Sequence, residues 1–242
     1  MSLYREQGIV LRTYKLGETD RIIHLLTQGR GKVRAVAKGV RRPGSRFGGR
    51  LEPYSHVDVQ LYAGRNLDII NQAELIAPFA GVRADFALSA CAATMAEAVD
   101  RVTEEGERNL RVFLLLRAGL QALEAEPPYP AIFVDAFLLR LASASGFHVF
   151  ADACANCRTP GPHAFLNVAR GGMLCTNCAP AGSKALDPST IALVRLLAGN
   201  DWVALPAAAE QLGARRTAAA FVRAFVEHHL DRSLRSYELV PR

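Results

Sequence analysis

The chain has 242 residues, of which 50% are hydrophobic, 21% charged and 7% aromatic, a composition that fits one large or two modest globular domains and excludes a disordered tail. Its formal net charge of +6 lies entirely in the first third: residues 1–80 hold 13 Lys and Arg against 7 Asp and Glu, whereas residues 81–242 hold 16 of each sign. The longest charge-free run, the thirteen residues 171–183, is too short for a membrane span, which needs about 18 residues.

Five short apolar or alternating runs in the first 80 residues predict β-strands, at 8–11, 21–26, 32–36, 57–61 and 67–70. Glycine-containing turns separate these runs. Five strands without a long helix are typical of a small closed barrel, so we predict an OB-fold nucleic-acid-binding domain over residues 1–80. Strand spacing alone does not distinguish it from an SH3-like barrel.

Eight basic residues and no acidic residue fall between positions 30 and 50. They are Arg30, Lys32, Arg34, Lys38, Arg41, Arg42, Arg46 and Arg50. A local cationic field on a neutral body is typical of a polyanion-binding module, although such runs also occur as solvated surface. The interspersed glycines favour single-stranded nucleic acid, for which backbone charge and base stacking act together. The candidates for stacking, each of which fits the barrel core equally well, are Tyr14, Phe47, Tyr54 and Tyr62.

After Pro78 the pattern becomes helical, and we predict an α-helical domain over residues 81–242. Apolar residues at helical spacing predict helices at 82–102, from Leu110 to before Pro127, at about 130–145, at 188–198 and at 214–233. Asp187 and Pro188 provide an N-cap and a first-turn proline for the helix at 188. We expect the tail after Arg235 to be poorly ordered, and Cys91 to be a small buried apolar residue.

Four cysteines form two Cys-x2-Cys pairs that are seventeen residues apart: Cys154, Cys157, Cys175 and Cys178. This spacing is typical of a zinc site, and four thiolates complete a tetrahedral shell with no open position. We therefore predict one structural Zn²⁺ per chain, in a module inserted at residues 151–182. Two disulfides are the alternative. His148 and His163 lie nearby, and we expect that they are not ligands.

The start of the chain bears on the state of these cysteines. Arg5 and Glu6 stand where a secretion signal needs its apolar core, so we expect a cytoplasmic protein in a reducing compartment. Disulfides are rare in such compartments, which favours metal binding over the disulfide alternative.

The sequence contains no phosphate-binding loop, no His-Glu-x-x-His pattern and no Gly-x-Ser-x-Gly nucleophile turn. His228 and His229 are adjacent, about 100° apart on a helix, and cannot chelate one ion from one face. Glu104, Glu105 and Glu107 would suit a Mg²⁺-dependent nuclease but fit a solvated helix junction better. We expect a binding protein rather than an enzyme, with no small-molecule substrate.

A series of short motifs follows one order along the chain: Gly8–Leu11, Gly17-Glu18, Asp20–Ile23, Leu25–Thr27, Ala37–Arg41, Ser45-Arg46, Leu51–Pro53 and the two cysteine pairs. Together they cover nearly the full length, and the chain resembles the RecO family of bacterial recombination mediators. The resemblance implies an OB-fold joined to a helical domain with a zinc module. It also implies binding to single- and double-stranded DNA, annealing of complementary strands and, with the partner RecR, loading of RecA onto DNA coated by single-strand-binding protein.

By this resemblance Lys38, Arg41 and Arg46 lie in the family's basic motif, while local charge alone adds Lys32, Arg34, Arg42 and Arg50 as DNA-binding candidates. The resemblance also implies a contact for single-strand-binding protein in the helical domain and association with the nucleoid during activity. From the short charge-free runs we expect no membrane association. Two other functions remain open from the residues: a zinc-bearing OB-fold protein for RNA or the ribosome, and a metal-dependent nuclease.

Overall fold

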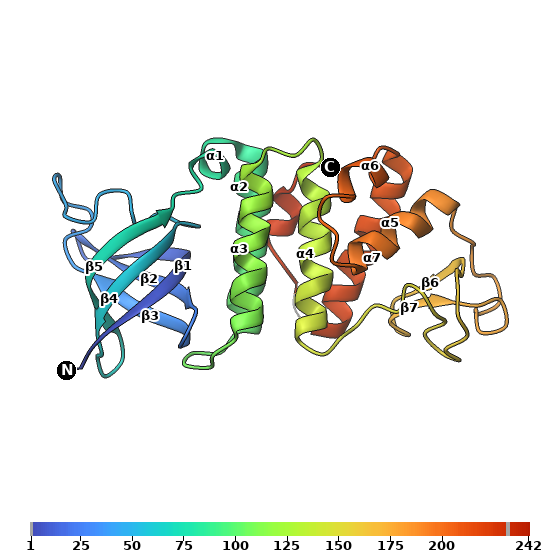
Figure 1. Ribbon diagram of the computed structural model, residues 1–242, viewed down its shortest axis with the longest axis horizontal. Coiled ribbons are helices and arrows are strands. Elements are labelled where there is room, and N and C mark those ends of the chain that lie inside the picture. Colours follow the sequence, from blue (N-terminus) through green and yellow to red (C-terminus); the bar gives the residue numbers. More distant parts are fainter. Residues whose placement is uncertain (1, 231–232) are drawn as a thin grey trace. The chain divides into compact units, whose positions relative to one another are not determined.

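The first five strands close into a barrel in the computed structural model, which describes residues 2–230 and 233–242 and divides into two units, Met1–Glu124 and Ala125–Arg242 (Figure 1). The strands are β1 (Leu3–Leu16), β2 (Asp20–Thr27), β3 (Gly31–Ala37), β4 (His56–Tyr62) and β5 (Asp68–Ala77). Their order around the barrel is β1-β2-β3-β5-β4, with β4 returning to β1 and with a parallel pairing between β3 and β5. The five predicted strands and the OB-like barrel are therefore confirmed.

Alternating burial explains why these sequences form a barrel. Along β3, Gly31, Val33, Ala35 and Ala37 are buried, whereas the residues between them, Lys32, Arg34 and Val36, lie on the outer side. Val57, Val59 and Leu61 of β4 alternate in the same way. This period of two places one apolar row of each strand in a shared interior. Two loop residues, Phe47 and Leu51, complete that core.

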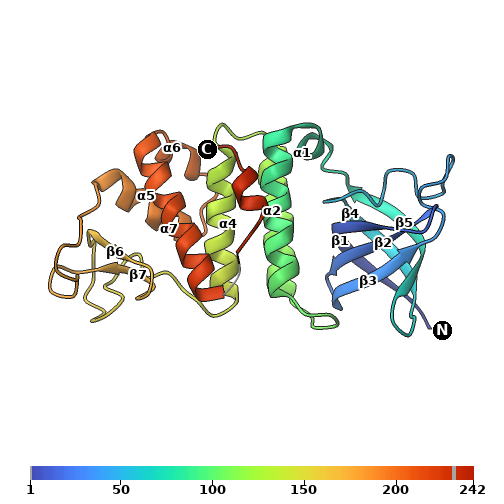
Figure 2. The same ribbon diagram turned by 180° about the vertical axis from the view of Figure 1, so that it is seen from behind.

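Three helices complete the first unit: α1 (Ala80–Ala84), α2 (Phe86–Val102) and α3 (Leu110–Glu124). The prediction of one continuous helix at 82–102 is wrong, because Asp85 is extended and its side chain caps α2 by accepting from the Leu88 N–H at 2.8 Å. α2 and α3 pack side by side (Figures 1 and 2). Cys91 is fully buried on α2, as predicted.

The second unit is built on α4 (Pro130–Ala144), which packs against α5 (Pro188–Ala198) and α7 (Leu212–Leu230) (Figure 2). The predicted cap of α5 is confirmed, since Asp187 accepts from the Thr190 N–H at 2.9 Å. A short helix, α6 (Leu205–Ala208), was not predicted. The end of the helix predicted at 214–233 lies partly outside the described residues, which resume at 233. Among the described residues, no helix is long and apolar enough to cross a membrane.

The C-terminal segment corrects another prediction. Residues Ser236–Leu239 form a 3-10 helix, η1, and Tyr237 is buried with its hydroxyl donating to Asp135 Oδ1 at 2.8 Å. Arg242 adds a bidentate pair with the same carboxylate, at 2.9 and 3.0 Å. The expectation of a poorly ordered tail after Arg235 is wrong, because a buried carboxylate in α4 requires these two partners.

The two-stranded sheet of the second unit lies between α4 and α5 in the sequence, within the predicted module at residues 151–182. Its strands are β6 (Phe165–Asn167) and β7 (Gly172–Leu174), and a small core forms around Cys154, Ala155 and Leu174. The domain boundary after residue 80 stays a prediction. It falls at the start of α1, and α1, α2 and α3 belong to the same unit as the barrel.

Candidate nucleic-acid interface and metal centre

The segment between β3 and β4 contains five of the eight predicted cations, and we call residues 38–50 the cationic loop. Successive tight turns shape it: the Arg42 N–H donates to the Gly39 carbonyl at 3.1 Å, and the Gly48 N–H donates to the Ser45 carbonyl at 3.0 Å. Phe47 anchors the loop, because its side chain is only 1% exposed and packs in the barrel core. A buried aromatic at its centre gives the loop a defined position on the barrel.

The base of the cationic loop is joined to the turn between β1 and β2. Asp20 accepts from the Gly39 N–H at 2.7 Å, and this hydrogen bond, followed by that from Thr19, lowers the pKa of the Asp20 carboxyl. The Arg41 N–H donates to the Thr19 carbonyl, and its guanidinium donates to the Glu18 carbonyl at 2.8 Å. The cationic loop and the turn around Thr19 therefore lie together at one end of the barrel.

Ion pairing divides the eight cations into two groups. Three of them pair with carboxylates: Arg30 with Glu6 at 3.8 Å, Lys32 with Asp100 at 3.3 Å, and Arg34 with Glu105 at 2.6 Å. The other five are exposed, and among residues 2–230 and 233–242 none of them forms an ion pair with a carboxylate: Lys38, Arg41, Arg42, Arg46 and Arg50. The charge of the cationic loop is thus available to an external anion.

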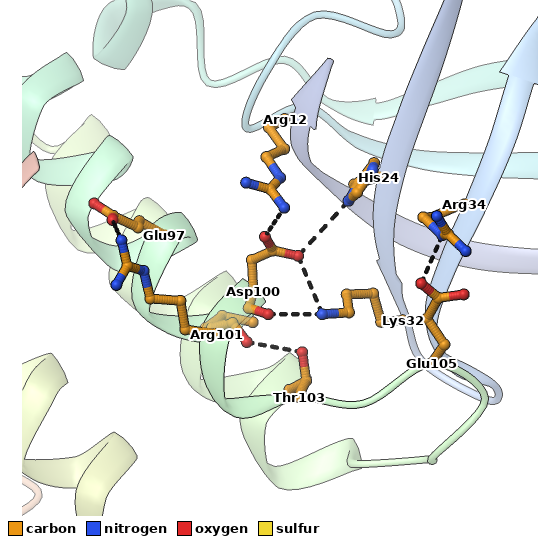
Figure 3. A network of polar contacts seen from close by, with 10 residues as sticks. Arg12, His24, Lys32, Arg34, Glu97, Asp100, Arg101, Thr103 and Glu105 are labelled. Atoms are coloured by element: carbon orange, nitrogen blue, oxygen red, sulfur yellow. Dashed lines mark hydrogen bonds and ion pairs between the residues drawn. The ribbon is translucent and has the colours of Figure 1, made fainter. Parts of the chain in front are cut away.

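Two of the paired cations, Lys32 and Arg34, belong to a group of polar contacts on the outer side of β1–β3 (Figure 3). Asp100 of α2 lies at its centre, with one carboxylate oxygen 2.6 Å from Arg12 Nη2 and the other 3.3 Å from Lys32 Nζ and 3.7 Å from His24 Nδ1. Lys32 also donates to the Asp100 carbonyl at 2.6 Å. Burial would raise the pKa of Asp100, but His24 and the charges of Lys32 and Arg12 lower it overall.

Arg12 and His24 were not singled out from the sequence. A signal for them exists, since Arg12 pairs in register with His24, and His24 pairs in register with Arg34. Residues in register on neighbouring strands share a face, so the outward position of Arg34 would have identified both once the strand pairing was known.

The four aromatic candidates for base stacking differ in how far their side chains are exposed. Phe47 belongs to the core, and Tyr54 is part-buried, with burial raising the pKa of its hydroxyl. Tyr14 and Tyr62 are 45% and 36% exposed, and the Tyr14 ring lies edge-on to His24 with 5.3 Å between ring centroids. Only these two of the four candidates present a ring to solvent on which a base can stack.

A shallow groove runs beside the cationic loop. Its lining consists of Arg46, Phe47, Arg50 and the β5 residues Asn71, Gln72, Ala73 and Glu74. The groove combines the guanidinium groups of Arg46 and Arg50, neither of which forms an ion pair with a carboxylate within the described residues, with the side-chain amides of Asn71 and Gln72. Such a surface offers charge for phosphates and hydrogen-bonding groups for base edges.

The four predicted cysteines come together in the second unit. Their Sγ atoms all lie within 4.8 Å of one another, and the Sγ atoms of Cys157 and Cys175 are 3.7 Å apart. In a tetrahedron with Zn–S bonds of about 2.3 Å, the sulfur atoms are about 3.8 Å apart. The cluster therefore fits one metal ion with four thiolate ligands, and no pair of its cysteines forms a disulfide.

The acidity of the thiols differs across the cluster. Burial of the Cys154 thiol opposes ionisation, but backbone hydrogen bonds from Cys157, Cys175 and Asn156 lower its pKa to about 5. The Asn156 amide lowers the pKa of Cys178, whereas its Cys175 neighbour and burial together raise it to about 11. Four thiolates this close repel one another, so a cation is needed before all four can ionise.

The remaining residues that might bind metal are placed elsewhere. His163 Nε2 lies 2.8 Å from the Thr159 carbonyl and His148 Nδ1 lies 2.7 Å from the Ser143 hydroxyl. Glu105 pairs with Arg34, and within the described part of the chain only the cysteines form a group of metal-ligating side chains. The residues Glu104, Glu105 and Glu107 thus do not converge as a nuclease site would require.

Comparison with known proteins agrees with this arrangement. The family profile "Recombination protein O N terminal" matches residues 1–79, and the profile "Recombination protein O C terminal" matches residues 83–238. Proteins named DNA repair protein RecO are 47% identical in Nocardioides sp., with 99% of this chain and all of the relative aligned, and 43% identical in Thermobifida fusca, with both chains fully aligned. The RecO protein of Cutibacterium acnes is 42% identical over both full lengths. The chain belongs to the RecO family of DNA repair proteins.

Proposed function

We propose that this protein binds DNA through the cationic loop and acts as a recombination mediator in the repair of gaps and double-strand breaks. The observation that carries the proposal is the set of five exposed cations that lack a carboxylate partner within the described residues, on a barrel of OB type. A solvated surface would be expected to mix both signs, as the remainder of the chain does. Unpaired cations on one loop instead favour phosphate binding.

The proposed activity is annealing without covalent chemistry. Two like-charged strands repel each other, and a cationic loop that neutralises phosphates on both lets their bases search for partners. The contacts are individually weak, so neither strand is held irreversibly. Single- and double-stranded DNA share the phosphate backbone, so the loop binds both. The resemblance extends the proposal to RecR as partner and to loading of RecA onto DNA coated by single-strand-binding protein.

The metal has a structural role in this proposal. We propose Zn²⁺ as the ion because four thiolates with tetrahedral spacing are its common structural shell. Four protein ligands leave no position for a substrate or water, so the ion holds residues 151–182 together and performs no reaction. We propose the cytoplasm as the location, since it keeps these thiols reduced.

Charge reversal tests the function. We expect the full-length variant Lys38→Glu plus Arg41→Glu to bind single-stranded DNA at least tenfold more weakly in a gel-shift titration at modest salt, because two attractive contacts become repulsive. The same variant should lose annealing of complementary strands, with and without single-strand-binding protein.

A matched control distinguishes an effect of the loop residues on binding from an effect of the protein's net charge. Lys184→Glu plus Arg170→Glu makes the same charge change at two exposed residues of the second unit and should bind nearly as wild type. Equal binding by wild type and the loop variant would refute the proposal. Stronger binding to RNA than to DNA of the same sequence would favour the RNA-binding alternative, and metal-dependent cleavage of labelled DNA would favour the nuclease.

A further inference from the structure

A second groove lies on the barrel beside β3, apart from the cationic loop. Its floor and walls come from β3, from the turn between β4 and β5, and from the start of the segment that joins α2 to α3. Four cations line it: Arg30, Lys32, Arg34 and Arg65. Asp68 is also part of the lining, but it is engaged by the Tyr4 hydroxyl.

On the side of the segment that joins α2 to α3, the groove is lined by one acidic residue, Glu105. Glu105 Oε1 lies 2.6 Å from Arg34 Nε, and Asp100, just before it in the sequence, engages Lys32 (Figure 3). We call residues 104–108 the acidic segment, which contains Glu104, Glu105 and Glu107. The Glu105 carboxylate stands where a phosphate of a bound strand would neutralise Arg34.

The acidic segment docks on β3 by few contacts. Lys32 and Glu105 form a parallel β-bridge, and the Gly106 N–H donates to the Lys32 carbonyl at 3.1 Å. Close approach requires glycine at position 31, because a Cβ there would lie 1.9 Å from the Glu107 carbonyl oxygen. All five residues of the acidic segment are exposed. An exposed segment with so few bonds can be displaced at low cost.

We propose that the groove beside β3 is a second binding site for single-stranded DNA, and that Glu105 occupies Arg34 as an internal substitute for phosphate until a strand displaces it. The inference rests on the proposed function, since it assumes that the ligand is DNA. Two sites on one barrel would let the protein hold one strand on the cationic loop and a second strand in the groove, which is what annealing requires.

The decisive variant increases binding instead of removing it. Glu105→Gln releases Arg34 with little effect on folding, because an exposed ion pair contributes little to stability. We expect full-length Glu105→Gln to bind a single-stranded oligonucleotide several-fold more tightly, with the slope of log affinity against log salt steeper by about 0.7, the value of one added phosphate contact.

Two controls make the result specific. Glu104→Gln removes the same charge from the same segment, at a residue with no ion pair in the described chain, and should bind as wild type. Adding Arg34→Gln to Glu105→Gln should abolish the gain. Equal binding by Glu105→Gln and Glu104→Gln, or a gain that persists without Arg34, would overturn the inference.

The loop variant keeps the two proposals distinguishable. If the groove is a separate site, Glu105→Gln also raises the residual affinity of the variant Lys38→Glu plus Arg41→Glu. Failure of the loop variant to lose affinity would contradict the proposed function alone, whereas absence of a gain from Glu105→Gln would contradict the groove alone.

Discussion

At the scale of single residues, Asp100 shows how a buried charge joins a helix to a barrel. Its carboxylate is almost inaccessible to solvent, and it contacts Arg12 of β1 and Lys32 of β3. Each contact alone would leave part of the carboxylate unpaired. Together they place opposite charge beside both oxygens of the carboxylate, which helps to offset the cost of its burial.

Removal of this charge should destabilise the first unit. We expect Asp100→Asn to lower the free energy of unfolding by about 3 kcal/mol, because the variant leaves the ammonium of Lys32, whose side chain is only 13% exposed, without its counterion. Thermal melting of the full-length variant measures the effect. As a control, Glu227→Gln removes one partner of an exposed pair with Arg223 and should change stability by less than about 1 kcal/mol.

The same group sets a pH dependence whose sign follows from its lowered pKa. A carboxyl with a lower pKa in the folded state stabilises the fold fully above its unfolded pKa of about 4, and the stabilisation is lost as pH falls through the folded pKa. The melting temperature should therefore fall less steeply with decreasing pH in Asp100→Asn than in wild type. An identical pH profile for the two proteins would contradict the network.

Also at the residue scale, the cations show what a sequence can and cannot predict. All eight stand in one basic run, and nothing in that run distinguishes Lys32 from Lys38. The distinction comes from Asp100 and Glu105, which are distant in the sequence and reach β3 only through the fold. Local charge in the sequence identifies a candidate surface. The ion pairs that form in the folded protein decide which of its cations remain available to an external anion.

At the scale of elements, apolar periodicity predicted the five strands but underestimated two of them. β1 begins at Leu3 and β5 ends at Ala77, both well beyond the predicted runs. The N-terminal part of β1 and the C-terminal part of β5 both pair with β4, through polar or exposed residues such as Arg5 and Glu74. Backbone hydrogen bonds supply the pairing there, so the hydrophobic pattern carries no signal. The docking of η1 was missed for a related reason, since it depends on the remote carboxylate of Asp135.

The cysteine spacing predicted that the four cysteines meet, because two Cys-x2-Cys turns need only come together to form a candidate tetrahedral site. We expect the purified protein to contain one zinc per chain and Cys154→Ser to lower zinc content and melting temperature. A structural zinc contributes about 10–16 kcal/mol of apparent folding free energy. Elemental analysis and thermal melting measure both effects.

Cys91 is the matched control for the zinc prediction, because it is a buried cysteine of α2 outside the cluster. Cys91→Ser should keep the full zinc content. Protein without stoichiometric zinc, or a Cys154→Ser variant that melts as wild type, would show that the cluster is not a structural zinc site.

At the scale of the whole molecule, the two units have different proposed roles. The barrel unit contains all the proposed contacts to DNA, and the second unit contains the cluster of four cysteines. Within the first unit, the barrel residues 1–80 contain the entire excess of positive charge, whereas residues 81–242 hold equal numbers of both signs. In the proposed function, the long-range field of the barrel attracts DNA without specifying its sequence.

The salt dependence of affinity for single-stranded DNA tests the central claim most directly. If the five cations of the loop each contact phosphate, the slope of log affinity against log salt is about −3.5, from about −0.7 per contact. Replacing Lys38 and Arg41 together by glutamine should reduce its magnitude by about 1.4, while the same change at Lys184 and Arg170 leaves it unaltered. A slope that is unaffected by the loop variant would contradict electrostatic binding of DNA by the cationic loop.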